Sequence, residues 1–253
     1  MGEEGVLLAV VFGLILVAAV LQRITGLGFA MMLAPFLVVI LGPHTGVMLT
    51  NMLAFVAPLL MLALVWRDIE WRRLLLIAPV ALLVMPLFGW VAAVSAPGPL
   101  YIVVASLVLI GLSLSLIVGR IHARADGPVT RVLTGIGAGG GVVLAGVGGP
   151  AMTIYAVVSR WNVRAFAATL QPFWILLSVA GFLTKVTFSG DEIPVFPWWF
   201  WAGSLAVIVA GLGIGTLIRG WVRDAAVRRL VIFLAFVGAL LSLITGIRET
   251  IGA

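Results

Sequence analysis

The sequence predicts an all-α polytopic membrane protein with about 8–10 transmembrane segments, arranged as two inverted repeats of five segments each. Its 253 residues are 63% hydrophobic and only 9% charged. Soluble domains average about 45–50% apolar and about 25% charged residues, so this chain lacks the polar residues that a water-facing surface needs. A glycine motif from the first half recurs 120 residues further along, which indicates an internal repeat.

The composition also excludes several classes of function. The chain has no cysteine, which removes disulfides, thiolate catalysis and cysteine-ligated metals. Its two histidines, His44 and His122, are too few and too far apart to predict a metal site. The net charge of +6 comes from arginines in short loops, so nucleic acid is not an expected partner. The acidic start at Met1–Glu4 is unlike a signal peptide, and the first apolar segment is expected to be retained.

Ten apolar segments follow one another along the chain. A full crossing needs about 20 residues at 1.5 Å rise per residue, and the segments 27–41 and 150–159 fall short of that. Because the chain between Arg131 and Arg160 must enter the membrane and return within 28 residues, we expect half-depth helices there that meet at a glycine-rich tip. The ten segments are 5–22, 27–41, 45–65, 73–94, 99–119, 130–145, 150–159, 165–187, 197–218 and 229–247.

The arginines predict which side of the membrane each loop occupies. If the segments alternate in direction, thirteen arginines fall on one side, and only Lys185 and Arg248 fall on the other. Loops rich in Arg and Lys stay in the cytoplasm, so both termini of this multi-pass chain are predicted to face outward from the inner (plasma) membrane. The thirteen are Arg23, Arg67, Arg72, Arg73, Arg120, Arg124, Arg131, Arg160, Arg164, Arg219, Arg223, Arg228 and Arg229.

The internal repeat relates the two halves of the chain. Gly26–Met32 aligns with Gly146–Met152 at an offset of 120 residues, and the same offset places Asn51 opposite Gln171. Each half holds five segments, and an odd number makes the halves enter the membrane from opposite sides. Such inverted repeats are common in secondary transporters. The predicted units are a first repeat at 1–119, a cytoplasmic loop at 120–128 and a second repeat at 129–253.

The breaks in the short segments supply the candidate binding site. Interrupted helices expose unpaired N–H groups and the positive end of a helix dipole, which suit an anion. Glycines also let ordinary transmembrane helices pack closely, so a purely structural role stays open. Their recurrence in both halves favours binding. The candidate glycines are Gly26 and Gly28 in the first half and Gly146, Gly148 and Gly149 in the second.

Three polar side chains near these breaks are further candidates for binding an anion. Arg23 lies three residues before the first glycine, where it would either hold an anion within the membrane or snorkel to the surface. Asn51 and Gln171 are uncharged amides within long apolar stretches. They would either donate to oxyanion oxygens or bridge helices, and their equivalence in the repeat favours binding.

Weaker candidates surround the same breaks. Thr25 would line the site or bond its own helix backbone. Pro150 and Tyr155 would either shape a cavity or pack in the core. Lys185 is expected to snorkel to the outer surface, where attraction of anions is the alternative role.

With these residues in view, the chain resembles the TauE/SafE family of sulfite exporter-like membrane permeases. The resemblance spans nearly the whole chain, in order and spacing. It implies export, or sometimes uptake, of small sulfur-containing or organic anions such as sulfite and sulfonates. The matching stretches are Thr25–Ala30 (TGLGFA) with Pro35, the loop Asp68–Arg73 (DIEWRR), Gly146–Pro150 (GVGGP) with Tyr155, and Phe166–Leu170 (FAATL).

The expected function is therefore that of a secondary transporter, most simply an exporter, of small anions by alternating access. No carboxylate lies within an apolar segment, so a mid-membrane proton relay is not evident. The chain has no Gly-x-x-x-x-Gly-Lys-Ser/Thr motif for hydrolysing ATP. An anion leaving a negative cell interior gains about 2.3 kcal/mol per charge per 100 mV, so the membrane potential, or an ion gradient, would drive export.

Other classes of function remain as alternatives. An anion channel differs from a transporter in giving flux that does not saturate. A non-transporting subunit of a membrane complex would not need broken helices, and an intramembrane enzyme would need a catalytic constellation that these residues do not supply. The expected partners are the small anion and the lipid bilayer, with a homodimer as an allowed assembly. No cofactor, metal ligand or catalytic residue is expected.

Overall fold

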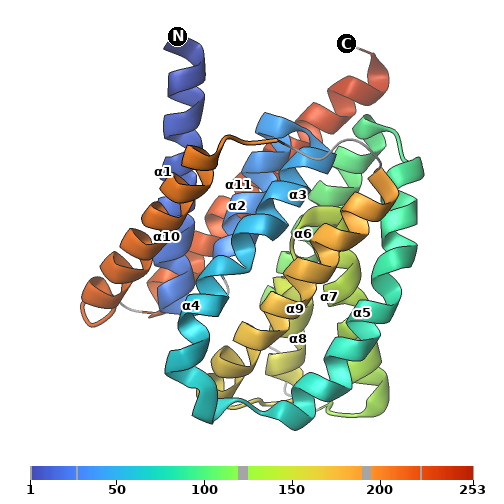
Figure 1. Cartoon of the computed structure of the whole chain (residues 1–253). Coiled ribbons are helices and arrows are strands. Elements are labelled where there is room, and N and C mark those ends of the chain that lie inside the picture. Colours follow the sequence, from blue (N-terminus) through green and yellow to red (C-terminus); the bar gives the residue numbers. More distant parts are fainter. Residues whose placement is uncertain (1, 27, 119–124, 190–194, 223, 253) are drawn as a thin grey trace.

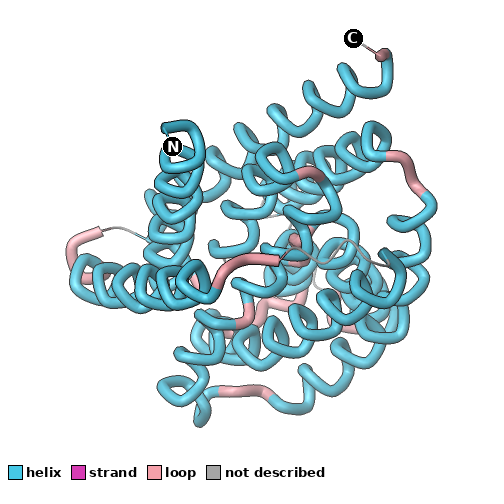
Figure 2. The backbone as a smooth tube through the Cα atoms, turned by 45° about the horizontal axis from the view of Figure 1, so that its top comes forward, coloured by secondary structure: helices cyan, strands magenta, loops and turns pink. Residues whose placement is uncertain are grey.

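The computed structural model describes residues 2–26, 28–118, 125–189, 195–222 and 224–252. These residues form α-helices joined by short turns, without a β-strand, as the sequence predicts (Figure 2). A 3₁₀ turn at Trp66–Asp68 follows the fourth helix. The helices are α1 (Gly2–Thr25), α2 (Gly28–Leu41), α3 (Pro43–Ala54), α4 (Val56–Val65), α5 (Trp71–Val94), α6 (Pro97–Val118), α7 (Pro128–Ala145), α8 (Gly149–Val158), α9 (Val163–Ser189), α10 (Trp198–Ile218) and α11 (Asp224–Ile251).

Within the described residues, eight helical stretches are long and apolar enough to cross a membrane, and α2 and α8 are the two shorter apolar helices. The 14 residues of α2 and the 10 of α8 rise about 21 Å and about 15 Å, against a hydrocarbon core of about 30 Å. Neither crosses alone, which confirms the expectation of short helices. The expected segment 45–65 divides at Phe55 into α3 and α4, which together make one stretch.

Glycine and proline set the helix ends that matter for the site. Gly26 and Gly146 adopt positive φ angles of 75° and 67°, a left-handed conformation that glycine adopts without strain, and they end α1 and α7. Gly42, with φ 87°, separates α2 from α3, and Pro43 then starts α3. Each of these three glycines lies at a turn between two consecutive helices.

The helices pack in pairs that involve both halves of the chain. α1 lies beside α10, α5 beside α7, α6 beside α11, and α3 beside α9 (Figure 1). Small residues allow the close approaches: a Cβ at Gly211 of α10 would lie 2.7 Å from the Cβ of Ala19 in α1. Gly139 of α7 likewise faces the backbone of Ala81 in α5. Such contacts replace the hydrophobic driving force that is absent between helices in lipid.

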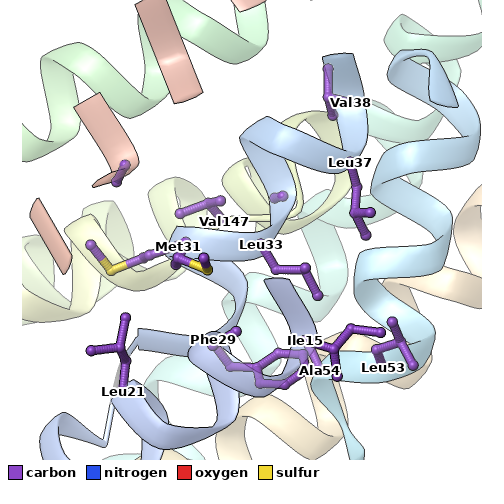
Figure 3. Close-up of a cluster of buried hydrophobic side chains, with 14 of the residues drawn as sticks. Ile15, Leu21, Phe29, Met31, Leu33, Leu37, Val38, Leu53, Ala54 and Val147 are labelled. Atoms are coloured by element: carbon purple, nitrogen blue, oxygen red, sulfur yellow. The ribbon is translucent and has the colours of Figure 1, made fainter. Parts of the chain in front are cut away.

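Two large buried clusters fill the bundle. One joins α1, α2 and α3 with α6, α10 and α11, and the other joins α5, α7, α8 and α9. In the first cluster, Phe29 of α2 lies near Ile15 of α1 and Ala54 of α3 (Figure 3). Val147, from the turn between α7 and α8, belongs to this same cluster, so the second glycine turn reaches into the first half.

Both ends of the chain lie at the same end of the bundle, whereas the α4–α5 and α8–α9 turns lie at the opposite end (Figure 1). We call these the terminal end and the arginine-rich end, because the two turns and their flanks carry Arg67, Arg72, Arg73, Arg160 and Arg164. Of the expected loop at 120–128, residues 120–124 lie outside the described residues.

Candidate functional site

A small cavity lies inside the bundle, where the second glycine turn meets α1, α2, α3 and α9. Its volume is about 30 Å³, which is room for about two water molecules. None of the described residues that line it is charged. The lining consists of Gln22, Phe29, Ala30, Met31, Asn51, Ala54, Pro58, Val142, Gly146, Gly148, Gly149, Trp174 and Ser178.

The N-terminus of α8 opens onto this cavity. Its N-cap residue is Gly148, and no side chain caps the helix. The first turn of a helix leaves N–H groups without intrahelical partners, and the aligned peptide dipoles make that end positive. Gly148 and Gly149 both line the cavity, so the uncapped end of α8 faces a space where an acceptor would satisfy it.

The N-terminus of α2, in contrast, is capped by a side chain. The side-chain carbonyl of Gln22 accepts a hydrogen bond from the backbone N–H of Phe29 at 3.2 Å, and its amide nitrogen donates to the carbonyl of Gly26 at 3.4 Å. The residue 120 positions after Gln22 is Val142, whose side chain has no polar atom to cap α8. A side chain therefore caps the Phe29 N–H at the start of α2, whereas the start of α8 has no side-chain cap.

Asn51 is the second amide at the cavity and is 2% exposed. Its side-chain nitrogen donates to the carbonyl of Val142 near the end of α7 at 3.5 Å. Gly181 of α9 packs against the same amide, since a Cβ there would lie 2.9 Å from the Asn51 nitrogen. Asn51 therefore connects α3, α7 and α9 at the cavity wall.

Each glycine turn abuts a helix from the other half. A Cβ at Gly26 would lie 3.4 Å from the Cβ of Ala167 in α9. One at Gly146 would lie 3.1 Å from the Cβ of Ala34 and 3.3 Å from the Cγ2 of Thr50. Gly28 is the first residue of α2. The expected glycines are thus brought to the middle of the bundle, with the second turn directly at the cavity.

Arg23 is directed toward α10. Its Nε donates to the hydroxyl of Thr216 at 2.7 Å, and Gly215 leaves room for its aliphatic stem. Arg23 is not one of the described residues that line the cavity, although its neighbour Gln22 is. The structure therefore places this cation in the contact between α1 and α10.

Three other expected site residues are also absent from the described cavity lining. The amide nitrogen of Gln171 donates to the carbonyl of Ala167 in its own helix at 2.7 Å. The hydroxyl of Thr25 donates to the carbonyl of Leu21 at 2.8 Å, as threonines in helices often do. Pro150 packs against Gly111 of α6, where a Cβ would lie 2.8 Å from the Pro150 Cβ.

Tyr155 belongs to a polar network near the arginine-rich end of the bundle. Its buried phenol donates to Oδ1 of Asp126 at 2.6 Å. The same oxygen accepts hydrogen bonds from Nε of Arg131 at 3.2 Å and from its Nη2 at 3.0 Å. The other carboxylate oxygen faces Nη2 of Arg73 at 3.5 Å. Asp126 thus joins α5, α7 and α8 at their bases.

These contacts favour the charged form of Asp126. The hydrogen bond from Tyr155 lowers the pKa of this carboxyl most strongly, and the guanidinium groups of Arg131 and Arg73 act in the same direction. Partial burial opposes them by raising the pKa, but the net direction is downward. Arg73 is itself held by Glu70 at 3.1 Å and by the ring of Trp161, whose centroid lies 4.6 Å from its Cζ.

We expect Asp126→Asn to lower the free energy of unfolding by about 1–3 kcal/mol, because three partners lose their charged acceptor. The lowered pKa means that the Asp126 charge stabilises the fold above about pH 4 and that this contribution is lost as the pH falls through the folded-state pKa. Thermal unfolding in detergent, followed from neutral pH down to about pH 3, checks both effects.

Asp68→Asn is the matched control for this prediction. Asp68 also pairs with an arginine at the same end, at 2.8 Å from Arg164, but the Arg164 side chain is 81% exposed. Exposed pairs contribute about 0–1 kcal/mol, so this variant should unfold close to the wild type. Equal destabilisation by the two variants would contradict a special role for Asp126.

Lys185 requires a correction. The sequence predicts that its long side chain snorkels to the outer surface, but the residue is buried in the bundle and only 1% exposed. It lies in the last part of α9, where the nearby Thr184 and Phe188 pack against Gly89 of α5. The prediction was wrong because it took the position of Lys185 near a segment end to mean access to solvent.

Sequence analysis missed Gln22, Trp174 and Ser178 as cavity residues. Gln22 is an amide whose position four residues before Gly26 places both on one helix face. Trp174 and Ser178 follow Gln171 at intervals of three and four residues, so all three also share one face. These spacings were the available signal for the cavity wall.

Comparison with known proteins gives a family match. The family model described as "Sulfite exporter TauE/SafE" matches residues 11–241. No curated protein matches the chain, and no solved structure matches it. The matched range includes both glycine turns, every residue of the cavity lining and the network around Asp126.

Proposed function

Because the chain belongs to the sulfite exporter TauE/SafE family, we propose that it exports small anions such as sulfite or sulfonates across the plasma membrane. One observation carries this proposal: the uncapped N-terminus of α8 faces a buried cavity whose other polar groups are uncharged. Positive helix ends and amide donors favour an anion, and the absence of carboxylates from the described lining disfavours a cation.

Each polar group of the cavity has a role in holding the anion. The first N–H groups of α8 donate to one oxyanion oxygen, and the hydroxyl of Ser178 and the amide of Asn51 donate to others. Gln22 positions the N-terminus of α2 next to them. A cavity with room for about two waters must widen for a four-atom oxyanion, and Met31 and Trp174 are the flexible and bulky side chains that would move.

We further propose that the two halves are inverted repeats. The left-handed glycines Gly26 and Gly146 stand 120 residues apart. The backbone N–H of each donates the corresponding helix-ending hydrogen bond to the carbonyl four residues earlier. The helix contacts support this symmetry, because exchanging the two halves turns each contact into another that the structure also has. The contact of α1 with α10 corresponds to that of α7 with α5, and the contact of α2 with α11 corresponds to that of α8 with α6. The pairs α3–α9 and α6–α11 would lie at the relating axis.

Alternating access follows from this arrangement. The glycine turn of one half meets a long helix of the other, so rocking of one repeat against the other would open the cavity first to one side and then to the other. The membrane potential, at about 2.3 kcal/mol per charge per 100 mV, would drive an anion out of a negative interior. An ion gradient is the other source of energy compatible with these residues.

The proposed orientation places the arginine-rich end in the cytoplasm and both termini outside. The excess of arginines in the α4–α5 and α8–α9 turns supports it, because short loops with many positive charges stay in the cytoplasm. The partners that the function requires are the bilayer and the transported anion, and a homodimer is the assembly that we propose.

Anion flux in proteoliposomes tests the function. Purified protein should give saturable sulfite or sulfonate efflux that increases with an inside-negative potential, and Gln22→Ala should reduce it about tenfold because the capping of α2 beside the cavity is lost. Flux that rises linearly with concentration would favour the channel. The absence of flux of either anion, with folded and oriented protein, would contradict the proposal.

A further inference from the structure

One face of α9 carries a stripe of residues that runs along the cavity. Gln171, Trp174, Ser178, Gly181 and Lys185 follow one another at intervals of three or four residues, which places them on the same side of the helix. Trp174 and Ser178 line the cavity, and Gly181 abuts the amide of Asn51. The stripe therefore continues past the cavity toward Lys185.

Lys185 lies beyond the cavity on the way to the terminal end. It follows Ser178 by seven residues, or about 10 Å along the helix, and α9 rises from the arginine-rich end to the terminal end (Figure 1). Its side chain is 1% exposed, although it is the one lysine of the sequence and charged groups are rarely buried in a membrane protein without a task.

We propose that Lys185 is a second binding position for the transported anion, between the central cavity and the outer side. This inference rests on the proposed function. Within its described lining, the central cavity offers only uncharged donors, so it would hold an anion without a countercharge. A cation about two helical turns further attracts the anion onward, and an ammonium group is a hydrogen-bond donor that suits oxyanion oxygens. Two successive sites of moderate strength allow entry and release.

The alternative is that Lys185 only holds helices together. Burial of an ammonium in a protein interior costs free energy, so replacing it with an apolar residue of similar length is neutral or stabilising unless the charge makes strong structural contacts. The two roles therefore predict different results for Lys185→Met. A transport role predicts altered kinetics at unchanged or higher thermal stability, whereas a structural role predicts lower thermal stability.

The experiment measures sulfite efflux from proteoliposomes for the wild type, Lys185→Met, Lys185→Arg and Arg248→Met. Lys185→Met should raise KM about tenfold or more at unchanged or higher thermal stability, and Lys185→Arg should restore most of the affinity because it keeps the charge. Arg248→Met is the matched control, since it removes an exposed cation in the last turn of α11, near the same end, and should leave KM unchanged.

The possible results separate the two proposals. Wild-type KM and rate in Lys185→Met, or loss of stability with an unaltered KM, would overturn the role of Lys185 and leave anion export standing. The absence of saturable flux in the wild type would overturn the proposed function together with this inference. If Lys185→Met does not fold, Lys185→Gln takes its place, and an Arg variant no better than the Gln variant would also overturn the inference.

Discussion

Gly148→Ala is expected to reduce anion flux at least about a hundredfold while the protein still folds. Gly148 caps α8 at the cavity, and a Cβ there would lie 3.0 Å from a ring carbon of Trp174 and 2.8 Å from the carbonyl oxygen of Ala138. The added methyl would take much of a space of about 30 Å³ and push Trp174 away from the helix end. Overpacking of this kind costs about 1–3 kcal/mol of stability.

The measurement for this prediction is initial sulfite efflux from proteoliposomes at matched protein density. Gly213→Ala in α10 is its control, because a Cβ at that position has no neighbour within 4 Å. That variant should transport normally and be slightly more stable, since alanine is favoured over glycine in helices by about 0.5–1 kcal/mol. Normal flux through Gly148→Ala would show that the anion does not use this cavity.

The helix boundaries were largely predictable from the sequence. Apolar length identifies the spans, and glycine and proline mark where they end, as the left-handed Gly26, Gly42 and Gly146 confirm. The short helices α2 and α8 also follow from length alone. These features depend on local sequence, which is why a single chain without a structure reveals them.

The direction in which individual side chains point, and so which neighbours they contact, was not predictable in the same way. A helix that is apolar on all sides gives little sign of which face is buried, so only the four-residue spacing from Gly26 separates Gln22, at the cavity, from Arg23, directed toward α10. The bond between Tyr155 and Asp126 joins residues 29 positions apart. The burial of Lys185 depends on which helices cover the end of α9.

The same reasoning explains why two amides that stand 120 residues apart differ in the structure. Asn51 lines the cavity, whereas Gln171 does not, although an offset of 120 residues equates them. In the first half Gln22 caps the short helix, and in the second half Val142 cannot. The cavity therefore lies where the starts of both short helices meet, and the residues that stand 120 positions apart decide which of the two helices is left without a side-chain cap.

Asn51→Asp is the substitution expected to be most damaging to anion flux among those that keep the shape of the site. It replaces a donor by a carboxylate in the cavity wall, where Asn51 is 2% exposed. Two like charges about 4 Å apart repel by about 4 kcal/mol at an effective dielectric constant near 20, which corresponds to about a thousandfold loss of affinity. Sulfite efflux and anion-dependent thermal stabilisation of the purified protein should both be lost.

Two comparisons isolate the charge from other effects of this substitution. Asn51→Ala removes the amide without adding a charge and should cost only about tenfold, the size of one lost hydrogen bond. Asn162→Asp adds the same charge at an exposed position, where Asn162 accepts hydrogen bonds from the N–H groups of Arg164 and Ala165 and aspartate caps a helix equally well. Equal losses in Asn51→Ala and Asn51→Asp would mean that Asn51 acts through its hydrogen bond to Val142 rather than by facing the anion, because both variants remove the amide N–H that donates to the Val142 carbonyl.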